Sequence, residues 1–128
     1  MRPVLAERAQ ACEDLRRLPD DTVQDFQDAG FYDICKPAAY GGYQRSPEMM
    51  YEIAMEIAKA CPSSAWGLCL ISVHNWEPGL MDPRAAEALW GEDRHTRYSS
   101  SYAPFGKLEL VDGGYRLSGR WELSLIHI

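Results

Sequence analysis

The sequence predicts an α+β fold, in which a block of helices is followed by the first strands of an antiparallel sheet. Apolar residues recur at helical spacing in successive segments between residues 4 and 90. From Arg94 onward the spacing changes to alternation, and Asp112-Gly113-Gly114 has the composition of a hairpin turn. Helices and strands that occupy separate parts of a chain are characteristic of this fold class.

The N-terminal part is predicted to be two helices and a loop. Residues 4 to 17 have apolar side chains at helical spacing among Glu and Arg, which indicates one amphipathic helix. A second helix begins at Asp20 or Asp21, both good cap residues, and ends at Gly30. Residues 31–45 contain proline and paired glycines and are therefore expected to form a loop, which must pack because it is rich in aromatic rings.

The next two helices are expected to contain most of the core. Ser46 caps the first of them, and its apolar stripe is assigned to the core: Met50, Ile53, Ala54, Ile57 and Ala58. Residues 62–76, with Ser63 or Ser64 as the cap, are apolar on every side of a helix. A helix of that kind belongs inside a protein, so we expect it to be the central one.

A short helix and a hairpin complete the predicted elements. The helix begins at Asp82-Pro83 and runs to about Trp90. Residues 96–102 are rich in strand formers, and residues 107–112 alternate clearly. A strand from Tyr115 pairs with them across the glycine turn. Two or three strands are marginally stable alone, so the sheet is expected to be incomplete.

The composition favours an intracellular globular domain. With 128 residues, of which 46% are hydrophobic, the chain is long enough for one domain with a core. A net charge of -6 without a basic cluster argues against nucleic acid as a partner. No stretch approaches the roughly 18 apolar residues of a membrane span or resembles a signal peptide. The four cysteines lack metal-finger spacing, so we expect a cytoplasmic protein without a metal.

His74 is the candidate functional residue of the central helix. Trp66, Leu70 and His74 are four residues apart and therefore lie along one helix face, where an indole and an imidazole would look into the same space. From the residues alone two interpretations stay open. His74 either caps a backbone carbonyl at the helix end or belongs to an active site.

A resemblance to a known family rests on these segments, in order: LPDDTVQDFQDAGFYDICKPAAYGGY, MEIAKACPSSAWGL, VHNW, and SSSYAPFG followed by VDGGYRLSGRW. Residues 4 to 121 resemble the acyl-CoA dehydrogenase fold. Within it they resemble the flavin-dependent aromatic monooxygenases, the oxygenase components of two-component systems such as 4-hydroxyphenylacetate 3-hydroxylase. The resemblance implies an N-terminal helical domain in residues 1–93 and the start of a middle β-domain in residues 94–122, with the C-terminal helical bundle missing.

The resemblance also implies a reaction. In this family a separate flavin reductase supplies reduced flavin, FMNH2 or FADH2, O2 adds at flavin C4a, and the hydroperoxide hydroxylates a phenol. We therefore expect a cytoplasmic oxidoreductase with a small aromatic substrate. The full-length protein is expected to be a homotetramer, and this chain alone is expected to be inactive.

Particular residues match the functional positions of the family. His74 and Ser100 match the pair that hydrogen-bonds the substrate hydroxyl, and Trp66 and Trp76 match walls of the substrate pocket. The flavin contacts by resemblance are Ser101, Tyr102, Ala103 and Trp121. Without the resemblance, the serines would be interpreted as a sheet edge hydrogen-bonded to water.

The end of the chain departs from the family pattern. After Trp121 the family continues with a serine-rich segment that approaches the flavin, whereas here Glu122 and LSLIHI follow. These six letters match one reading frame of a transposon-end adapter used for sequencing libraries. We therefore expect residues 123–128 to be a non-native tail, with a genuine terminal strand as the alternative.

Two other functions are alternatives. An acyl-CoA dehydrogenase would oxidise an acyl thioester with FAD and a carboxylate base from the missing part. VHNW, SSSYAP and the lack of a Thr-Glu-Pro pattern favour the hydroxylase branch. The other alternative is a helical binding module in which Trp66 and His74 are core residues.

Overall fold

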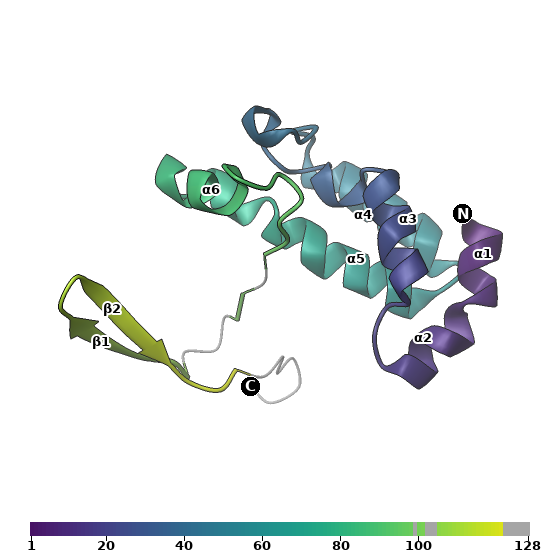
Figure 1. Ribbon diagram of the computed structural model, residues 1–128. Helices are drawn as coiled ribbons and strands as arrows, with labels where there is room; N and C mark the ends of the chain where they lie inside the picture. Colours follow the sequence, from purple (N-terminus) through teal and green to yellow (C-terminus); the bar gives the residue numbers. More distant parts are fainter. Residues whose placement is uncertain (99, 102–104, 122–128) are drawn as a thin grey trace. The chain divides into compact units, whose positions relative to one another are not determined.

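The computed structural model describes residues 1–98, 100–101 and 105–121. The chain forms two compact units, residues 1–98 and 99–128. The first is helical, and the second contains a two-stranded antiparallel hairpin (Figure 1). The predicted order, helices first and strands second, is confirmed. The helical unit includes residues 94–98, which the sequence analysis groups with the strands.

The first predicted helix is two helices in the structure, α1 (Arg2–Glu7) and α2 (Ala9–Leu15). Arg8 separates them, with φ of -88° and ψ of -3°, outside the usual α-helical range. The Arg8 guanidinium donates to the Asp25 carboxylate at 2.7 Å. The apolar spacing continues across the break, which is why the sequence pattern does not reveal it.

The helix α3 (Asp20–Asp28) begins after Pro19, and neither aspartate caps it through its side chain. Asp20 and Asp21 lie instead in its first turn, where negative charge interacts favourably with the helix dipole. Gly30 ends the helix as predicted, with a left-handed φ of 70°.

The aromatic loop contains two short 3-10 turns, η1 (Phe31–Asp33) and η2 (Ala38–Tyr40). The chain then folds back on itself, since the backbone N–H of Gln44 donates to the Lys36 carbonyl at 3.0 Å. This close approach requires Gly42, because a Cβ atom there would lie 2.1 Å from the Lys36 carbonyl oxygen.

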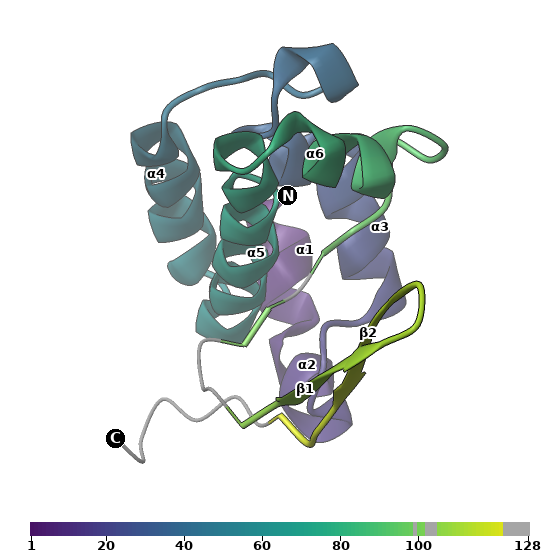
Figure 2. The same ribbon diagram turned by 90° about the vertical axis from the view of Figure 1, so that its left-hand side faces the viewer.

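The helices α4 (Pro47–Ala58) and α5 (Pro62–His74) pack side by side (Figure 1; Figure 2). The predicted α4 stripe is confirmed, with Met50, Ala54 and Ile57 buried and the two other members partly buried. Both helices contribute to a core that also includes α1, α2, α3 and η1: Leu5, Cys12, Phe26, Tyr32, Ile57, Cys61, Ala65 and Leu68.

The start and the burial of α5 differ from the prediction. Cys61 caps the helix instead of a serine, because its Sγ accepts from the Ser64 backbone N–H at 3.4 Å. Full burial was expected, yet the side chain of Trp66 is 50% exposed. Residues 64, 65, 68, 72 and 74 form the buried side.

A 3-10 turn, η3 (Glu77–Leu80), leads to α6 (Pro83–Trp90). Asp82 caps α6 as predicted, because its carboxylate accepts from the Arg84 backbone N–H at 2.9 Å. The hydrogen bonds from the side chain and backbone of Arg84 lower the pKa of Asp82.

The hairpin pairs β1 (Lys107–Val111) with β2 (Gly114–Ser118), with Leu108 opposite Leu117. Its glycine turn is confirmed, and Gly113 has φ of 79°. Residues 96–98, 100 and 101 form no strand, although their composition favours one. In the described part of the chain no helix has the length and apolar character of a membrane span.

Candidate functional site

His74 is the last residue of α5, and its side chain is buried, with 7% exposure. Its Nδ1 is hydrogen-bonded to the Leu70 carbonyl one turn earlier. A carbonyl oxygen only accepts, so Nδ1 carries the proton and a neutral His74 has a bare Nε2. Nε2 is buried and has no partner among the described residues. His74 therefore caps a backbone carbonyl and also keeps one free acceptor.

Two hydrogen bonds attach the end of α5 to η1. The Ser72 hydroxyl donates to the Phe31 carbonyl at 3.2 Å, and the Asn75 side-chain amide donates to the Tyr32 carbonyl at 2.9 Å. Both donors are buried. Because these bonds lie on either side of His74 in sequence, they fix the backbone that carries the imidazole.

Further unpartnered polar atoms lie in the same part of the fold. The Tyr32 hydroxyl and the Asn75 Oδ1 are buried and have no partner within the described chain. Burial raises the pKa of Tyr32, and the nearby Arg97 charge opposes this effect. Such atoms are uncommon in folded proteins and each needs an explanation.

Two aromatic contacts in this region were not predicted from the sequence. The Tyr98 ring meets the His74 imidazole edge-on, with 5.8 Å between centroids and 71° between planes. The Arg97 guanidinium lies 5.6 Å from the centroid of the Tyr32 ring. No short-range pattern signals either contact, although Tyr98 directly precedes the serine run that the resemblance singled out.

Trp66 lies on surface grooves on two sides of α5. One groove, of about 430 Å³, is apolar and includes Tyr51 and Met55 of α4. The other, of about 300 Å³, includes Arg17 and Leu18. His74 is not among the described residues that line either groove. The expected common space for the indole and the imidazole is therefore not found in these grooves, and the role of Trp66 stays a prediction.

Trp76 lines a third groove, of about 440 Å³, together with Cys35, Pro37 and Gly79. The described lining of this groove also lacks His74. Trp76 is 37% exposed, which leaves its ring accessible to a bound molecule. Its assignment to the substrate pocket stays a prediction.

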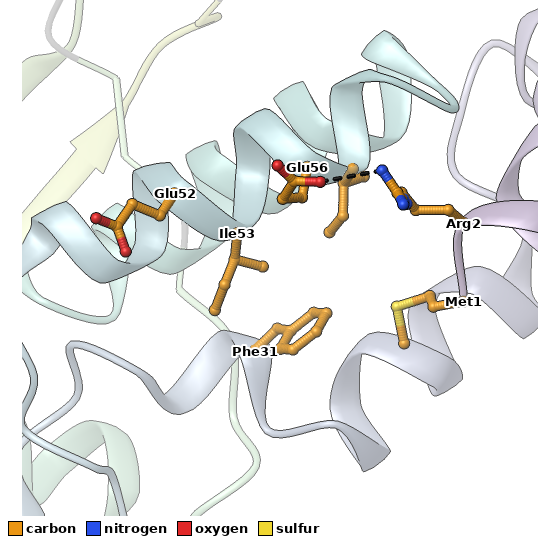
Figure 3. Close-up of a pocket in the computed structure, with 7 residues that line it drawn as sticks. Met1, Arg2, Phe31, Glu52, Ile53 and Glu56 are labelled. Atoms are coloured by element: carbon orange, nitrogen blue, oxygen red, sulfur yellow. Dashed lines mark hydrogen bonds and ion pairs between the residues drawn. The ribbon is translucent and has the colours of Figure 1, made fainter.

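A further pocket, of about 390 Å³, lies between α1, η1 and α4 (Figure 3). Phe31 and Ile53 form part of an apolar lining, and the side chains of Arg2 and Glu56 form an ion pair at 3.1 Å. It contains none of the residues assigned by resemblance. We assign it no function.

The second unit contains the remaining predicted residues. Ser100 and Ser101 are described, whereas Tyr102 and Ala103 lie outside the described residues. The Ser100 hydroxyl has no hydrogen-bond partner in the part of the chain that the structure describes. The pairing of Ser100 with His74 stays a prediction.

Trp121 packs within the hairpin unit. A Cβ atom at Gly106 would lie 2.8 Å from the indole, and one at Gly119 would lie 3.0 Å from it. The ring thus lies close to the backbone of both glycines. The flavin contacts assigned to this unit depend on the resemblance alone. Among the residues that the structure describes, no cluster of His, Cys, Asp and Glu has the arrangement of a metal site.

Comparison with known proteins gives consistent matches. A family model of the acyl-CoA dehydrogenase N-terminal domain matches residues 1–78. The oxygenase subunit HsaA of a flavin-dependent monooxygenase from Mycobacterium tuberculosis is 48% identical over 122 residues, which is 95% of this chain and 31% of HsaA. The oxygenase component of an FADH2-dependent resorcinol hydroxylase from a Rhizobium species is 35% identical over 91% of this chain and 28% of that protein.

A solved structure agrees with these matches. The 3-HSA hydroxylase from Rhodococcus sp. RHA1 superimposes with a TM-score of 0.86 at 47% identity, over 92% of this chain and 30% of that one. The chain thus spans about a third of the length of the relatives it matches.

Proposed function

Because the chain belongs to the acyl-CoA dehydrogenase N-terminal domain family, we propose that it is the helical part of a reduced-flavin-dependent monooxygenase that hydroxylates a phenolic substrate. Support comes from its 48% identity with an oxygenase subunit and its 35% identity with the oxygenase component of a resorcinol hydroxylase. Resorcinol is a phenol, which agrees with a phenolic substrate class.

The observation that carries this proposal is the buried, unpartnered Nε2 of His74. A lone pair held away from water is suited to accept the hydrogen of a phenolic hydroxyl. As that proton moves toward Nε2, negative charge develops on the phenol oxygen and raises the electron density of the ring. The ring carbon next to the hydroxyl then reacts more readily with an electrophilic oxygen.

The Nδ1 bond to the Leu70 carbonyl supports this role. As Nε2 takes up a proton, positive charge spreads over the imidazole, and the carbonyl dipole stabilises that charge. The Ser100 hydroxyl is proposed as the second contact to the substrate oxygen, and Trp66 and Trp76 as pocket walls. A bound reduced flavin, FMNH2 or FADH2, would activate O2, with one oxygen atom entering the ring and the other leaving as water.

The flavin and protein partners follow from the same proposal. FADH2 is the first cofactor to test, because a relative is an FADH2-dependent hydroxylase. Ser101, Tyr102, Ala103 and Trp121 are the proposed flavin contacts. A separate flavin reductase is the proposed partner, and the whole protein is proposed to be a cytoplasmic homotetramer.

A chimaera tests the proposal. Residues 1–121 of this chain would replace the matching part of the 3-HSA hydroxylase from Rhodococcus sp. RHA1, and the purified protein would be assayed with a flavin reductase, NADH, FAD and 3-HSA. We expect hydroxylated product that depends on the phenol. Flavin reduction by an acyl-CoA would favour the dehydrogenase alternative. A folded chimaera that does neither would support a binding module.

The His74→Ala variant of this chimaera is expected to lose hydroxylation by about 100-fold, the usual scale of acid–base assistance. NADH consumption and hydrogen peroxide release should persist, because oxygen activation does not require His74. The ratio of product to oxygen consumed measures the effect. Tyr115→Ala, which removes an exposed ring of the hairpin, is the control and should stay within about twofold. An unchanged ratio in His74→Ala would refute the role of His74.

A further inference from the structure

The segment from Asp93 to Tyr98 has no regular secondary structure, yet side-chain contacts hold it in place along its length. The Asp93 carboxylate accepts from the His95 backbone N–H at 2.9 Å and from the Thr96 hydroxyl at 3.2 Å. The His95 ring lies within hydrogen-bonding distance, 3.1 Å, of the Gln27 side-chain amide. The segment is therefore ordered by its own turn and by α3.

Two buried side chains hold the backbone of the same segment. The Lys36 ammonium donates to the Arg94 carbonyl. The indole N–H of Trp90 donates to the Thr96 carbonyl at 3.0 Å. Both Lys36 and Trp90 are only 1% exposed, so these two anchors belong to the interior of the helical unit.

The segment ends with two side chains that contact the end of the helical core. Arg97 lies over the ring of Tyr32 at 5.6 Å, and Tyr98 meets the ring of His74 at 5.8 Å. Direct contacts therefore connect the buried side chains of Lys36 and Trp90, through the segment, to the His74 imidazole. The position of Tyr98 thus depends on the core of the helical unit as well as on its own loop.

The contact matters because one hydrogen bond does not fully fix an imidazole. A half-turn about the Cβ–Cγ bond of His74 would exchange Nδ1 with Cδ2 and Nε2 with Cε1. It would break the bond to the Leu70 carbonyl and move the bare nitrogen away from its present position. The Tyr98 ring packs against the imidazole in a T-shaped arrangement and resists this rotation.

We propose that Tyr98 is a positioning residue, whose ring holds the His74 imidazole as the Nδ1–H tautomer with the Nε2 lone pair free. This inference deepens the proposed function and rests on it for its catalytic consequence. The positioning itself is a property of residues 1–98 and does not require flavin or substrate. It therefore has a test of its own.

The test is nitrogen-15 NMR of the 128-residue chain at pH 8, where an ordinary imidazole is neutral. Long-range proton–nitrogen correlations report which ring nitrogen carries the proton, and His74→Gln assigns the signals. We expect Nδ1–H at His74 in the wild type and in Tyr98→Phe, which keeps the ring. In Tyr98→Ala the Nε2–H fraction should rise at least fivefold.

Two further variants make the NMR result decisive. Tyr98→Leu keeps the apolar volume but removes the aromatic ring. It therefore separates loss of the ring contact from general loosening of the segment. Tyr115→Ala removes an exposed tyrosine of the hairpin and should leave His74 unchanged. A folded Tyr98→Ala variant with the wild-type tautomer would overturn the proposal. So would a Tyr98→Phe variant that behaves like Tyr98→Ala, because the hydroxyl and not the ring would then be responsible.

The chimaera gives the second measurement. Tyr98→Ala should lower the ratio of product to oxygen consumed by three- to tenfold, and Tyr98→Phe should leave it within about twofold. A tautomer change with unaltered coupling would support the positioning and count against the proposed role of His74. Lower coupling with an unaltered tautomer would overturn the positioning and make Tyr98 a direct substrate contact. The two proposals therefore fail in distinguishable ways.

Discussion

Lys36 places a positive charge inside the helical unit. Its ammonium donates to the Arg94 carbonyl, lies 3.4 Å from the Asp33 carboxylate and is 5.0 Å from the centroid of the Trp90 ring. The Lys36 side chain is 2% exposed. A buried charge of this kind is tolerated only when its partners are all in place, so the contacts around Lys36 act as one unit.

The Lys36→Met variant is expected to lower the free energy of unfolding by about 3 kcal/mol, because it removes one member of a buried charge pair and leaves the other uncompensated. Urea unfolding followed by tryptophan fluorescence measures the change. Lys59→Met is the matched control: its ion pair with Glu56 is exposed, and its effect should be under about 1 kcal/mol.

A double variant separates the charge from the packing. Lys36→Met combined with Asp33→Asn should be more stable than Lys36→Met alone, because the unpaired carboxylate is gone. If Lys36→Met proved no more destabilising than Lys59→Met, Lys36 would not be the anchor that the contacts indicate.

At the scale of elements, the loop after η2 requires a residue without a side chain at position 42, which is Gly42. A Cβ atom at Gly42 would lie 2.1 Å from the carbonyl oxygen and 2.6 Å from the Cβ of Lys36. The obstacle is partly backbone, so it cannot move aside as the end of a flexible side chain would. The neighbouring Gly41 has a left-handed φ of 86°. A Cβ atom there would meet Arg94 Cδ first, at the ordinary contact distance of 3.5 Å.

Alanine substitutions at the two glycines are therefore expected to lower the free energy of unfolding by different amounts. Gly42→Ala should destabilise the chain by about 3 kcal/mol or prevent folding, because overlap with backbone forces the loop apart. Gly41→Ala should cost about 1 to 2 kcal/mol, the penalty of a left-handed alanine. Urea unfolding of both variants checks the order. Equal costs would mean that the loop is free to adjust at Gly42.

Sequence patterns predicted the elements better than their boundaries. The stripe of α4, the Asp82 cap and the glycine turn of the hairpin follow from local chemistry and were predicted correctly. The break at Arg8 and the cap of α5 depend on contacts of individual side chains, and the helical spacing of apolar residues does not predict such contacts. Residues 96–98 have strand composition, yet the contacts of Thr96 with Trp90 and of Arg97 with Tyr32 decide their path instead.

The candidate site was predictable only in part for the same reason. Helical spacing correctly placed Trp66 and His74 on one helix, but it could not show what covers each residue. Trp66 lies on open grooves, whereas His74 is buried beside Tyr98. Contacts between residues this far apart in sequence leave no short-range signal, and Tyr98, Asn75 and Tyr32 were missed on that account.

At the scale of the whole molecule, the two units contribute unequally to the core. The buried hydrophobic residues of the described chain lie between Leu5 and Trp90. In the hairpin, Leu110 and Tyr115 are 79% and 70% exposed. A two-stranded hairpin with exposed apolar side chains is marginal by itself. Most of the stability of the chain should therefore come from residues 1–98.

Truncation tests this division. A chain of residues 1–98 should unfold in urea with a free energy within about 1 kcal/mol of the full chain, because the hairpin adds no buried hydrophobic residue among those described. A chain of residues 1–91 is the matched control. It also loses the Arg94 and Thr96 carbonyls that accept from Lys36 and Trp90, so it should be less stable by about 2 to 3 kcal/mol.

The comparison of the two truncations distinguishes two sources of stability. If both chains were equally weakened, the second unit would support the helices directly, and residues 93–98 would have no special part. If only residues 1–91 were weakened, the irregular segment would be established as part of the helical unit. The second result is expected, because each of the buried donors Lys36 and Trp90 has its acceptor in that segment. An unpaired buried donor costs more than the net value of the bond it loses, so removing the acceptors should weaken the helices themselves.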